Sequence, residues 1–333
     1  MTTAAPDVRA FNPPLRSRRN LLQAISWDAA VVLVFWVLLS IAFGIGAKQF
    51  WSIDNFLAIA STGVVLAILS LGQTAAIMIG GFDLSVGGAA ALAGVGFAIL
   101  SNDGFGTWPS ILIAVIGLGG AIGLVNALAI NVVGINALIA TLGTMSITGG
   151  LANIFSNGLA LPLQSSSASV LANPTIGRLP IYVWVAIGLF GLAAVFLTRT
   201  TTGRSLYVLG GNRKAAVLAG LPVTAIAIGV YVVCAMLAAL AGVVGTSELS
   251  AASPSVSSTN TLLSITAVVL GGGSLAGGEG GVGGTLVGVL VLATLSDGLA
   301  ITGVPGFYQD LATGIVLLLA VGVSALRNRQ RRQ

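Results

Sequence analysis

The 333-residue sequence has no histidine, a single cysteine and few charged residues, which make up 7% of the chain. Without histidine, a Ser-His-Asp triad, a histidine general base and a histidine-ligated metal are all excluded. The lone Cys234 lies in an apolar run, so it can form neither an internal disulfide nor a thiolate metal site by itself. No G-x-x-x-x-G-K-[ST] pattern occurs, so the chain lacks the phosphate-binding loop that this motif marks.

What the chain has instead is apolar sequence: 56% of its residues are hydrophobic and its mean hydropathy is +1.03. A soluble domain carries about 25% charged residues, and this chain cannot cover a surface that faces water. Its apolar runs of about 18–24 residues match helices that cross a hydrocarbon core. The 46 glycines occur inside these runs as well as between them, which favours helices packed through small residues over a β-barrel. The sequence therefore predicts an all-α integral membrane protein.

Ten apolar segments are long enough to be predicted as transmembrane helices. In the second segment the Gly72-Gln73 pair marks a candidate break, and the eighth segment is short and runs into glycines. The segments lie near 29–47, 55–80, 84–101, 109–131, 136–157, 180–198, 224–246, 261–275, 282–301 and 307–326. We expect one transmembrane domain over 29–326, with a polar tail at 1–28 and a basic tail at 327–333.

The placement of basic residues predicts the orientation of the chain. Four arginines precede the first segment, four basic residues lie between the sixth and the seventh, and four arginines follow the tenth. With ten spans all three places fall on one side, and the positive-inside rule makes that side the cytoplasm. Only Lys48 and Arg178 fall on the other side. Both termini and the loop 199–223 are therefore predicted to be cytoplasmic.

A carboxylate at a helix junction inside a membrane is costly, and Asp83 in GGFDLSVGG is in such a place. It precedes the third segment closely enough to accept backbone N–H bonds at the N-terminus of that helix. The alternative is direct contact with a substrate or a coupling ion.

The fifth segment carries hydroxyl groups at helical spacing. Thr141, Thr144 and Thr148 share one helix face, and Asn153 follows farther along. Such a stripe could line a path for a polyol, so these four residues and Asp83 are the candidate path residues. Threonines also bond their own helix carbonyls or a neighbouring helix, and both interpretations stay open. In the fourth segment, Asn126 and Asn131 are five residues apart and do not share a face, and each is expected to hydrogen-bond to another helix.

Two pairs of segments echo each other weakly. TAAIMIGGFDLSVGG (74–88) is similar to TAVVLGGGSLAGGEGG (266–281), and SNGLAL (156–161) is similar to SDGLAI (296–301). Paired patterns of this kind suggest duplicated halves, which are common in transporters. Glycine-rich sequence also produces such echoes by chance, so the duplication is a hypothesis.

The loop TGRSLYVLGGNRKAAVLAGLPV (202–223) is basic and punctuated by glycine. Gly210-Gly211 and Gly220 bound a predicted short helix at about 213–219. This helix is expected to offer a small apolar face to a partner, made of Ala215, Ala216 and Leu218. The positive charges of the loop would by themselves only enforce topology.

Four stretches, taken together, resemble the ribose-type permease family: GGFDLSVGG, ATLGTMSITGGLA, TTGRSLYVLGGNRKAAVLAGLPV and LGGGSLAGGEGGVGGTLVGVLVLATLSDGL. They occur in the order and with the spacing of that family, and the resemblance covers about residues 30–325. The family supplies the membrane subunits of bacterial ABC importers for monosaccharides and related small polyhydroxy compounds. The resemblance thus implies a multi-pass protein of the bacterial cytoplasmic membrane.

The resemblance implies that loop 199–223 is the coupling region that docks onto an ATP-binding subunit. The implied coupling residues are Gly203, Arg204, Gly210, Gly211, Asn212, Ala215, Ala216 and Gly220. It also implies that ATP and Mg²⁺ bind to the partner subunit, so this chain binds no cofactor and is not an enzyme. The expected partners are the ATP-binding cassette subunit, an extracytoplasmic solute-binding protein, a second permease copy or paralogue, and membrane lipid, with no nucleic acid.

The chain departs from the family pattern on the expected docking surface. Arg213-Lys214 follow GGN where acidic residues are common, Glu279 replaces a common basic residue, and Ser324 stands near a frequent aspartate. The expected substrate is a neutral sugar, because no charge in the middle of a span is available for an ionic group. Permeases for nucleosides or branched-chain amino acids are the nearest alternatives, and a self-sufficient secondary transporter or channel is the alternative of a different class.

Overall fold

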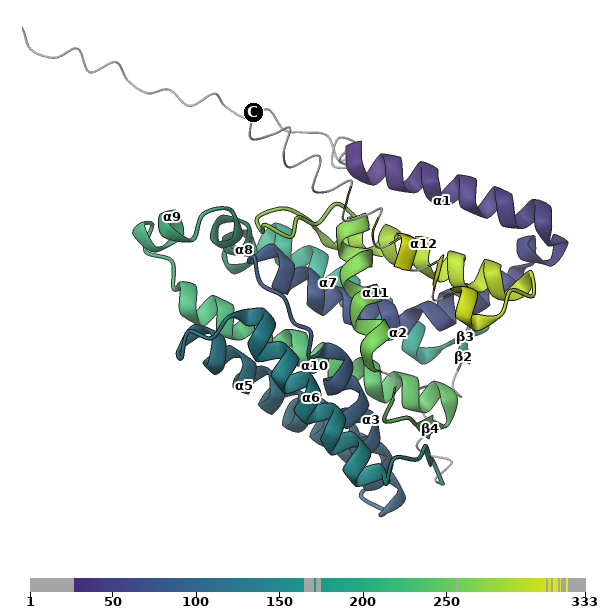
Figure 1. The fold of residues 1–333 in the computed structure, drawn as a ribbon, viewed down its shortest axis with the longest axis horizontal. Helices are drawn as coiled ribbons and strands as arrows, with labels where there is room; N and C mark the ends of the chain where they lie inside the picture. The colour runs from purple at the N-terminus through teal and green to yellow at the C-terminus, as the bar shows by residue number, and fades with distance from the viewer. Residues whose placement is uncertain are drawn as a thin grey trace, which may run out of the picture.

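The computed structural model describes residues 27–164, 171, 175–255 and 257–309, and beyond them 311, 312, 314–316, 318 and 322. This part of the chain is almost entirely helical (Figure 1). Its helices are α1 (Trp27–Gly46), α2 (Ile53–Met78), α3 (Val86–Asn102), α4 (Thr107–Leu112), α5 (Gly120–Asn131), α6 (Ala137–Ser156), α7 (Ile181–Arg199), α8 (Thr201–Gly211), α9 (Arg213–Leu218), α10 (Val223–Leu249), α11 (Ser257–Leu270) and α12 (Val282–Ile301). A short 3₁₀ turn, η2 (Lys48–Trp51), separates α1 from α2.

Every predicted apolar segment contains a helix where the structure describes it, although in the eighth segment α11 ends at Leu270 and residues 271–275 form a loop. Within the described residues, six helices are long and apolar enough to cross a membrane, and α1, α3 and α11 contain shorter apolar stretches. The tail predicted at 1–28, apart from its last two residues, lies outside the described residues. The basic tail at 327–333 and most of the segment at 307–326 also lie outside them.

Gly72 does not break α2, which is continuous from Ile53 to Met78. A Cβ at Gly72 would lie 3.2 Å from the Cα, carbonyl oxygen and Sγ of Cys234, so this glycine allows α2 and α10 to approach closely. The expectation of a break was wrong because a glycine that reads as a helix breaker in water serves as a packing residue between membrane helices.

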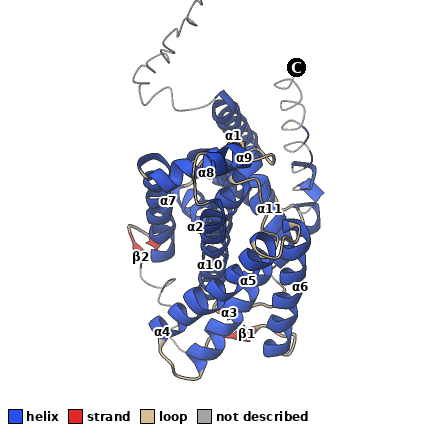
Figure 2. Cartoon of the chain, turned by 90° about the vertical axis from the view of Figure 1, so that its left-hand side faces the viewer, coloured by secondary structure: helices blue, strands red, loops and turns tan. Residues whose placement is uncertain are grey.

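Helices α2 and α10 occupy the middle of the bundle (Figure 2), and α10 packs along α2, α3 and α5. Small residues make these contacts close. A Cβ at Gly242 of α10 would overlap the carbonyl oxygen of Ala90 in α3, and a Cβ at Gly123 of α5 would lie 2.7 Å from the carbonyl oxygen of Tyr231. Helix packing in lipid depends on such backbone approach, because apolar surface gains little from leaving a solvent that is itself apolar.

The helix that spans Thr107–Asn131 is built from α4, a π-helical segment η3 (Ile113–Gly119) and α5. Gly119 ends the π-helical segment, where a Cβ would lie 2.8 Å from the Cβ of Ala239 and 3.0 Å from the carbonyl oxygen of Ala235 in α10. The π-helical segment thus ends at a close approach to α10, one turn before the still closer approach at Gly123.

Four two-residue strands lie away from α8 and α9, so the bundle has two distinct ends (Figure 1). Strand β1 (Leu161–Pro162) pairs antiparallel with β4 (Ala251–Ala252). Strand β2 (Thr175–Ile176) pairs antiparallel with β3 (Leu179–Pro180). We call these two places the α8–α9 end and the β1–β4 end.

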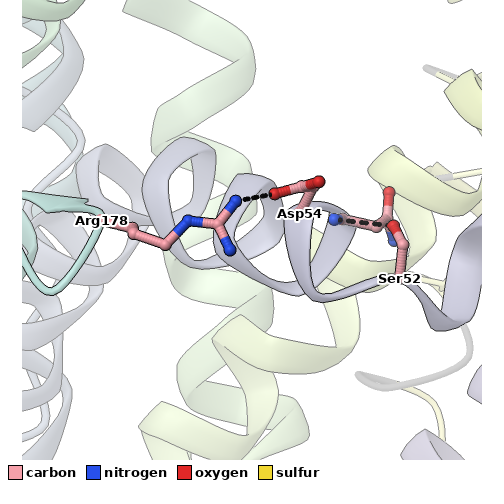
Figure 3. A network of polar contacts seen from close by, with 4 residues as sticks. Ser52, Asp54 and Arg178 are labelled. Carbon is pink, nitrogen blue, oxygen red and sulfur yellow. Dashed lines mark hydrogen bonds and ion pairs between the residues drawn. The ribbon is translucent and has the colours of Figure 1, made fainter.

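An exposed ion pair ties the β2–β3 hairpin to the start of α2 (Figure 3). Arg178 in the hairpin turn pairs with Asp54, with side chains 64% and 78% exposed. Beside it, Ser52 Oγ accepts the backbone N–H of Asn55 at 3.2 Å and caps α2. Such a pair in water is worth little, because solvent screens the charges and both side chains lose entropy.

We therefore expect Arg178→Ala to lower the unfolding free energy by less than about 1 kcal/mol. Arg178 has φ +70°, and alanine keeps the cost of that positive φ, so the substitution isolates the ion pair. The measurement is thermal denaturation of the detergent-purified protein, with Asp54→Ala and the double variant completing a mutant cycle. A coupling energy above about 2 kcal/mol would contradict this expectation.

Candidate coupling element, polar cluster and cavity

The chain between α7 and α10 forms two helices whose ends follow from local capping. Thr200 Oγ1 accepts the N–H of Gly203 at 2.9 Å and begins α8. Asn212 Oδ1 accepts the N–H of Ala215 at 3.0 Å and begins α9. Gly220, with φ +75°, ends α9 in the left-handed conformation that glycine adopts at low cost. The short helix predicted at 213–219 is found as α9, whereas α8 was not predicted.

The outward face of α9 differs from the predicted apolar face. Ala216 is fully buried, while Val217 and Leu218 are 58% and 88% exposed. Ala215 is also exposed, as are Arg213 and Lys214. The prediction that Ala216 faces a partner was wrong, because α9 turns this small side chain toward the body of the protein. Leu218 is exposed as predicted, and its exposed apolar neighbour Val217 was missed; only the position of Val217 on α9 distinguishes it from lipid-facing apolar residues.

Helix α8 lies against the body of the protein along a face of glycines and leucines. Leu206 and Leu209 are buried, and a Cβ at Gly203 would overlap the carbonyl oxygen of Phe196. Arg204 stays exposed and donates to the carbonyl oxygen of Thr198 at 3.3 Å. Of the four predicted coupling residues on α8, Gly203 is therefore packed and Arg204 is exposed, and Gly210 and Gly211 differ from each other in the same way.

Gly210 makes the closest of these contacts. A Cβ there would overlap the carbonyl oxygen of Met78 and the amide nitrogen of Gly278, whereas a Cβ at Gly211 would have no atom within 4 Å. The N–H of Gly278 donates to the Met78 carbonyl oxygen at 2.9 Å. Gly80 and Gly277, with φ +77° and +87°, turn the two chains at this point. We call this contact of Met78, Gly80, Gly210, Gly277 and Gly278 the glycine junction.

The glycine junction joins three segments that are distant in the sequence. The loop 79–85 after α2 and the loop 271–281 after α11 meet each other and α8 there. Tyr207 of α8 donates its phenol hydrogen to the carbonyl oxygen of Gly280 at 3.2 Å. Burial raises the pKa of the Tyr207 phenol, so it remains a donor at neutral pH. The two loops belong to the segments 74–88 and 266–281, whose sequences echo each other.

Asp83 lies at the inner end of loop 79–85 within a buried polar cluster. Its Oδ1 accepts the N–H of Ser85 at 2.9 Å and the hydroxyl of Ser85 at 2.5 Å. Asn126 Nδ2 in α5 donates to Ser85 Oγ at 2.7 Å, so Asn126 bonds across to the residue that precedes α3. The same prediction for Asn131 was wrong, because its Nδ2 donates to the carbonyl oxygen of Ala127 in its own helix at 3.0 Å. Ser85 immediately precedes α3, so Asp83 lies just before the start of that helix. The backbone N–H that Asp83 accepts is that of Ser85, which is not yet part of the first turn of α3.

Two further polar side chains lie beside this cluster. Cys234 Sγ of α10 lies 3.9 Å from Gln73 Oε1 of α2, and both residues are buried. Within the described residues, Asp83 Oδ2, Asn126 Oδ1 and Gln73 Nε2 are buried without a protein hydrogen-bond partner. Buried polar atoms of this kind are uncommon and tend to mark places with a role beyond packing.

The structure brings the three predicted threonines together on one buried face of α6. The hydroxyls of Thr141, Thr144 and Thr148 donate to the carbonyl oxygens of Ala137, Ala140 and Thr144 at 2.8, 3.1 and 2.8 Å. A Cβ at Gly88 of α3 would overlap Thr148 Oγ1, so the stripe packs on α3. Asn153 is exposed and donates to the carbonyl oxygen of Gly149 at 2.9 Å. Their assignment to a solute path stays a prediction.

A cavity of about 210 Å³ lies at the β1–β4 end, and the sequence did not point to it. It lies between α2, α3, α10, the chain around β4 and the first turn of α11. Among its lining residues are Thr62, Leu69, Gly87, Ala91, Gly94, Gly245, Thr246, Glu248, Ser253 and Asn260. One feature of the sequence could have indicated this cavity: α3 and α10 each carry a run of small residues at helical spacing.

Residues 55–321 match the protein family described as branched-chain amino acid transport system / permease component. The chain belongs to this family, and it is therefore a permease component of a transport system and a multi-pass membrane protein. A permease component of this kind carries no ATPase and binds no cofactor, because ATP is hydrolysed by a partner subunit.

Individual relatives cover nearly the whole chain. Ribose import permease protein RbsC of Escherichia coli (strain K12) is 37% identical over 91% of this chain and 95% of its own length. L-arabinose ABC transporter permease protein AraH of Azospirillum brasilense is 35% identical over 99% of this chain and 96% of its own. L-arabinose transport system permease protein AraH of Escherichia coli (strain K12) is 34% identical over 92% and 93%. No solved structure matches the chain significantly.

Proposed function

We propose that this chain is the membrane permease subunit of an ABC importer for a monosaccharide or a similar small polyhydroxy solute. The observation that carries the proposal is the set of relatives named for ribose and L-arabinose import, which align over 91% or more of the chain. The glycine-bounded element α8–α9, with its exposed Val217–Leu218 pair, supplies the docking surface that an external ATPase needs.

The proposed topology has ten transmembrane helices with both termini in the cytoplasm. The proposal takes α1, α2, α3, the helix Thr107–Asn131, α6, α7, α10, α11 and α12 as nine spans, and the segment 307–326, most of which lies outside the described residues, as the tenth. The α8–α9 end then faces the cytoplasm and carries Arg204, Arg213 and Lys214, while Arg178 lies at the opposite side. This charge difference agrees with the positive-inside rule.

The proposed coupling surface consists of an exposed and a packed part. Val217, Leu218 and the neighbouring cations contact the ATP-binding cassette subunit, and apolar residues near the centre of such an interface contribute most to binding. Gly203, Gly210 and Ala216 hold α8–α9 against the body of the permease, so that movement of the element reaches the glycine junction. Asn212 and Gly220 set the two ends of α9.

The remaining partners follow from the proposed class. An extracytoplasmic solute-binding protein docks at the β1–β4 end, where the connection 158–179 lies, and residues 165–170 and 172–174 of that connection lie outside the described residues. A second permease copy or a paralogue completes the membrane part of the importer. The duplicated halves remain a hypothesis, supported by the contact between the two echoing segments at the glycine junction.

The test is co-expression of the chain with its ATP-binding subunit and purification in mild detergent. ATPase activity is then measured, together with ribose and L-arabinose uptake in proteoliposomes supplied with the solute-binding protein. We expect a stable complex and ATP-dependent uptake of a monosaccharide. Leu218→Asp is expected to weaken the complex by roughly 30-fold, because a central apolar anchor is worth about 2 kcal/mol. Leu159→Asp is the matched control for the affinity of that complex alone, since Leu159 is 69% exposed and lies at the opposite end, in the connection proposed to dock the solute-binding protein.

The family description also names branched-chain amino acids, so leucine is the competitor to include in the uptake assay. Uptake of leucine without any monosaccharide would move the proposal to an amino-acid permease. Uptake that survives ATP depletion, from a chain that purifies alone, would instead indicate a secondary transporter.

A further inference from the structure

We propose that the cavity at the β1–β4 end is a binding subsite for one monosaccharide-sized, uncharged polyhydroxy solute, formed within a single permease chain. This inference rests on the proposed function and specifies a place where the solute is held. It concerns the space between α2, α3 and α10, not the threonine face of α6.

The size of the cavity suits a small solute. Its volume of about 210 Å³ is below the range of roughly 300–1,000 Å³ that is usual for drug-sized ligands. It corresponds to roughly seven waters at about 30 Å³ each. Glycine and alanine make up much of the lining, so few side chains project into the cavity. They include Gly87, Ala91 and Gly94 on α3 and Gly242 and Gly245 on α10.

The chemistry of the lining suits a hydroxyl-rich molecule and disfavours an anion. Thr62, Thr246, Glu248, Ser253 and Asn260 provide hydroxyl, carboxyl and amide groups in one space. The lining residues within the described part of the chain include no lysine and no arginine. An amino acid would leave its carboxylate without a cation there, and the Glu248 carboxyl group would repel an anion. A sugar brings several hydroxyls that both donate and accept, and it carries no charge that needs a partner.

The deep end of the cavity is adjacent to the polar cluster and, through it, to the glycine junction. Leu69 lines the cavity on α2 one turn before Gln73, and Gly87 lines it on α3 two residues after Ser85. The N–H of Gly87 donates to Thr261 Oγ1 of α11 at 3.1 Å. Solute at the deep end would therefore contact the start of α3, the helix that follows directly from loop 79–85 and the glycine junction.

This arrangement would let the presence of solute in the subsite affect the coupling element α8–α9. A solute that presses on the start of α3 acts on loop 79–85, which begins directly after Met78, the residue of α2 that Gly210 of α8 contacts. Occupancy of the cavity and the position of the coupling element are then linked through one short segment of chain. A coupling between two sites requires such a shared element whose position both can bias.

The first experiment fills the cavity with a side chain. A Cβ at Gly245 would have only Val65 Cγ2 within 4 Å, at 3.5 Å, so the side chain of Gly245→Leu extends into the open space. In the proteoliposome assay we expect monosaccharide uptake to fall by at least about tenfold while the complex with the ATPase stays intact. Gly229→Leu is the matched control on the same helix, because a Cβ there meets no atom within 4 Å and Gly229 lies outside this cavity.

The second experiment measures occupancy directly and does not depend on transport. Cys234 is the only cysteine and is buried, so a Cys234→Ala background carrying Thr246→Cys has one thiol, placed in the cavity. We expect a water-soluble methanethiosulfonate reagent to label it, and ribose or L-arabinose at about ten times Kd to slow labelling roughly tenfold. Leucine is expected to have no effect.

Labelling that no monosaccharide slows, or no labelling at all, would overturn the subsite. So would wild-type uptake by Gly245→Leu. Each of these results leaves the proposed function standing, provided that the wild-type complex imports a monosaccharide with ATP. If the wild-type complex imports none, the proposed function itself fails.

Discussion

Gly210→Ala is expected to reduce ATP-driven uptake by at least about tenfold, whereas Gly211→Ala leaves it within about twofold. The two residues are neighbours in the same helix, so the substitutions share their effect on helix propensity. They differ in surroundings, because a methyl group at Gly210 overlaps the backbone of Met78 and Gly278, while one at Gly211 meets no atom within 4 Å. Overpacking costs typically about 1–3 kcal/mol, and backbone atoms held by a hydrogen bond yield less readily than side chains.

The measurement compares uptake and ATPase activity of the two variants in the same reconstituted complex. If α8 transmits the movement of the ATPase to the two loops, Gly210→Ala retains ATP hydrolysis and loses the uptake that depends on it. Equal uptake by both variants would show that the glycine junction does not take part in coupling. A complex that fails to assemble with Gly210→Ala alone would assign the junction to the docking of the element.

Asp83→Ala is the second substitution with a large expected effect. It removes the acceptor of the Ser85 backbone N–H and the Ser85 hydroxyl, and it loosens the arrangement that holds Asn126. Each buried donor left without a partner costs about 1–3 kcal/mol. We expect the apparent melting temperature of the detergent-purified protein to fall by at least about 4 °C and uptake to be largely lost.

Asp83→Asn is the informative companion, because its amide oxygen can still accept both bonds from Ser85. We expect it to keep most of the stability and of the ATP-dependent uptake. If Asp83→Asn instead abolished uptake and shifted its pH dependence, with ATP depletion having no effect, Asp83 would be carrying a proton or a coupling ion. That result would favour a secondary transporter over the proposed importer.

The sequence by itself determined the class of this protein and the positions of its membrane helices. Both depend on properties that are local along the chain: the length of an apolar run must match the hydrocarbon core, and a helix satisfies its own backbone hydrogen bonds. The positions where α9 begins and ends also depend on local sequence, because the Asn212 side chain caps its first turn and Gly220 adopts the positive φ that ends it. The family resemblance followed from four motifs in order, and the comparison with known permeases confirmed it.

Only the tertiary structure decided which faces of these helices meet. In a soluble protein the apolar side of a helix points inward, but lipid and protein interior are both apolar, so hydropathy does not distinguish them. For this reason Ala216 was assigned to the wrong side of α9, and α8 escaped notice. The glycine junction, the bond between Ser85 and Asn126, and the cavity all join segments that are far apart in the sequence. Their formation depends on backbone approach at a few glycines, which nothing in the sequence distinguishes from the rest of its 46 glycines.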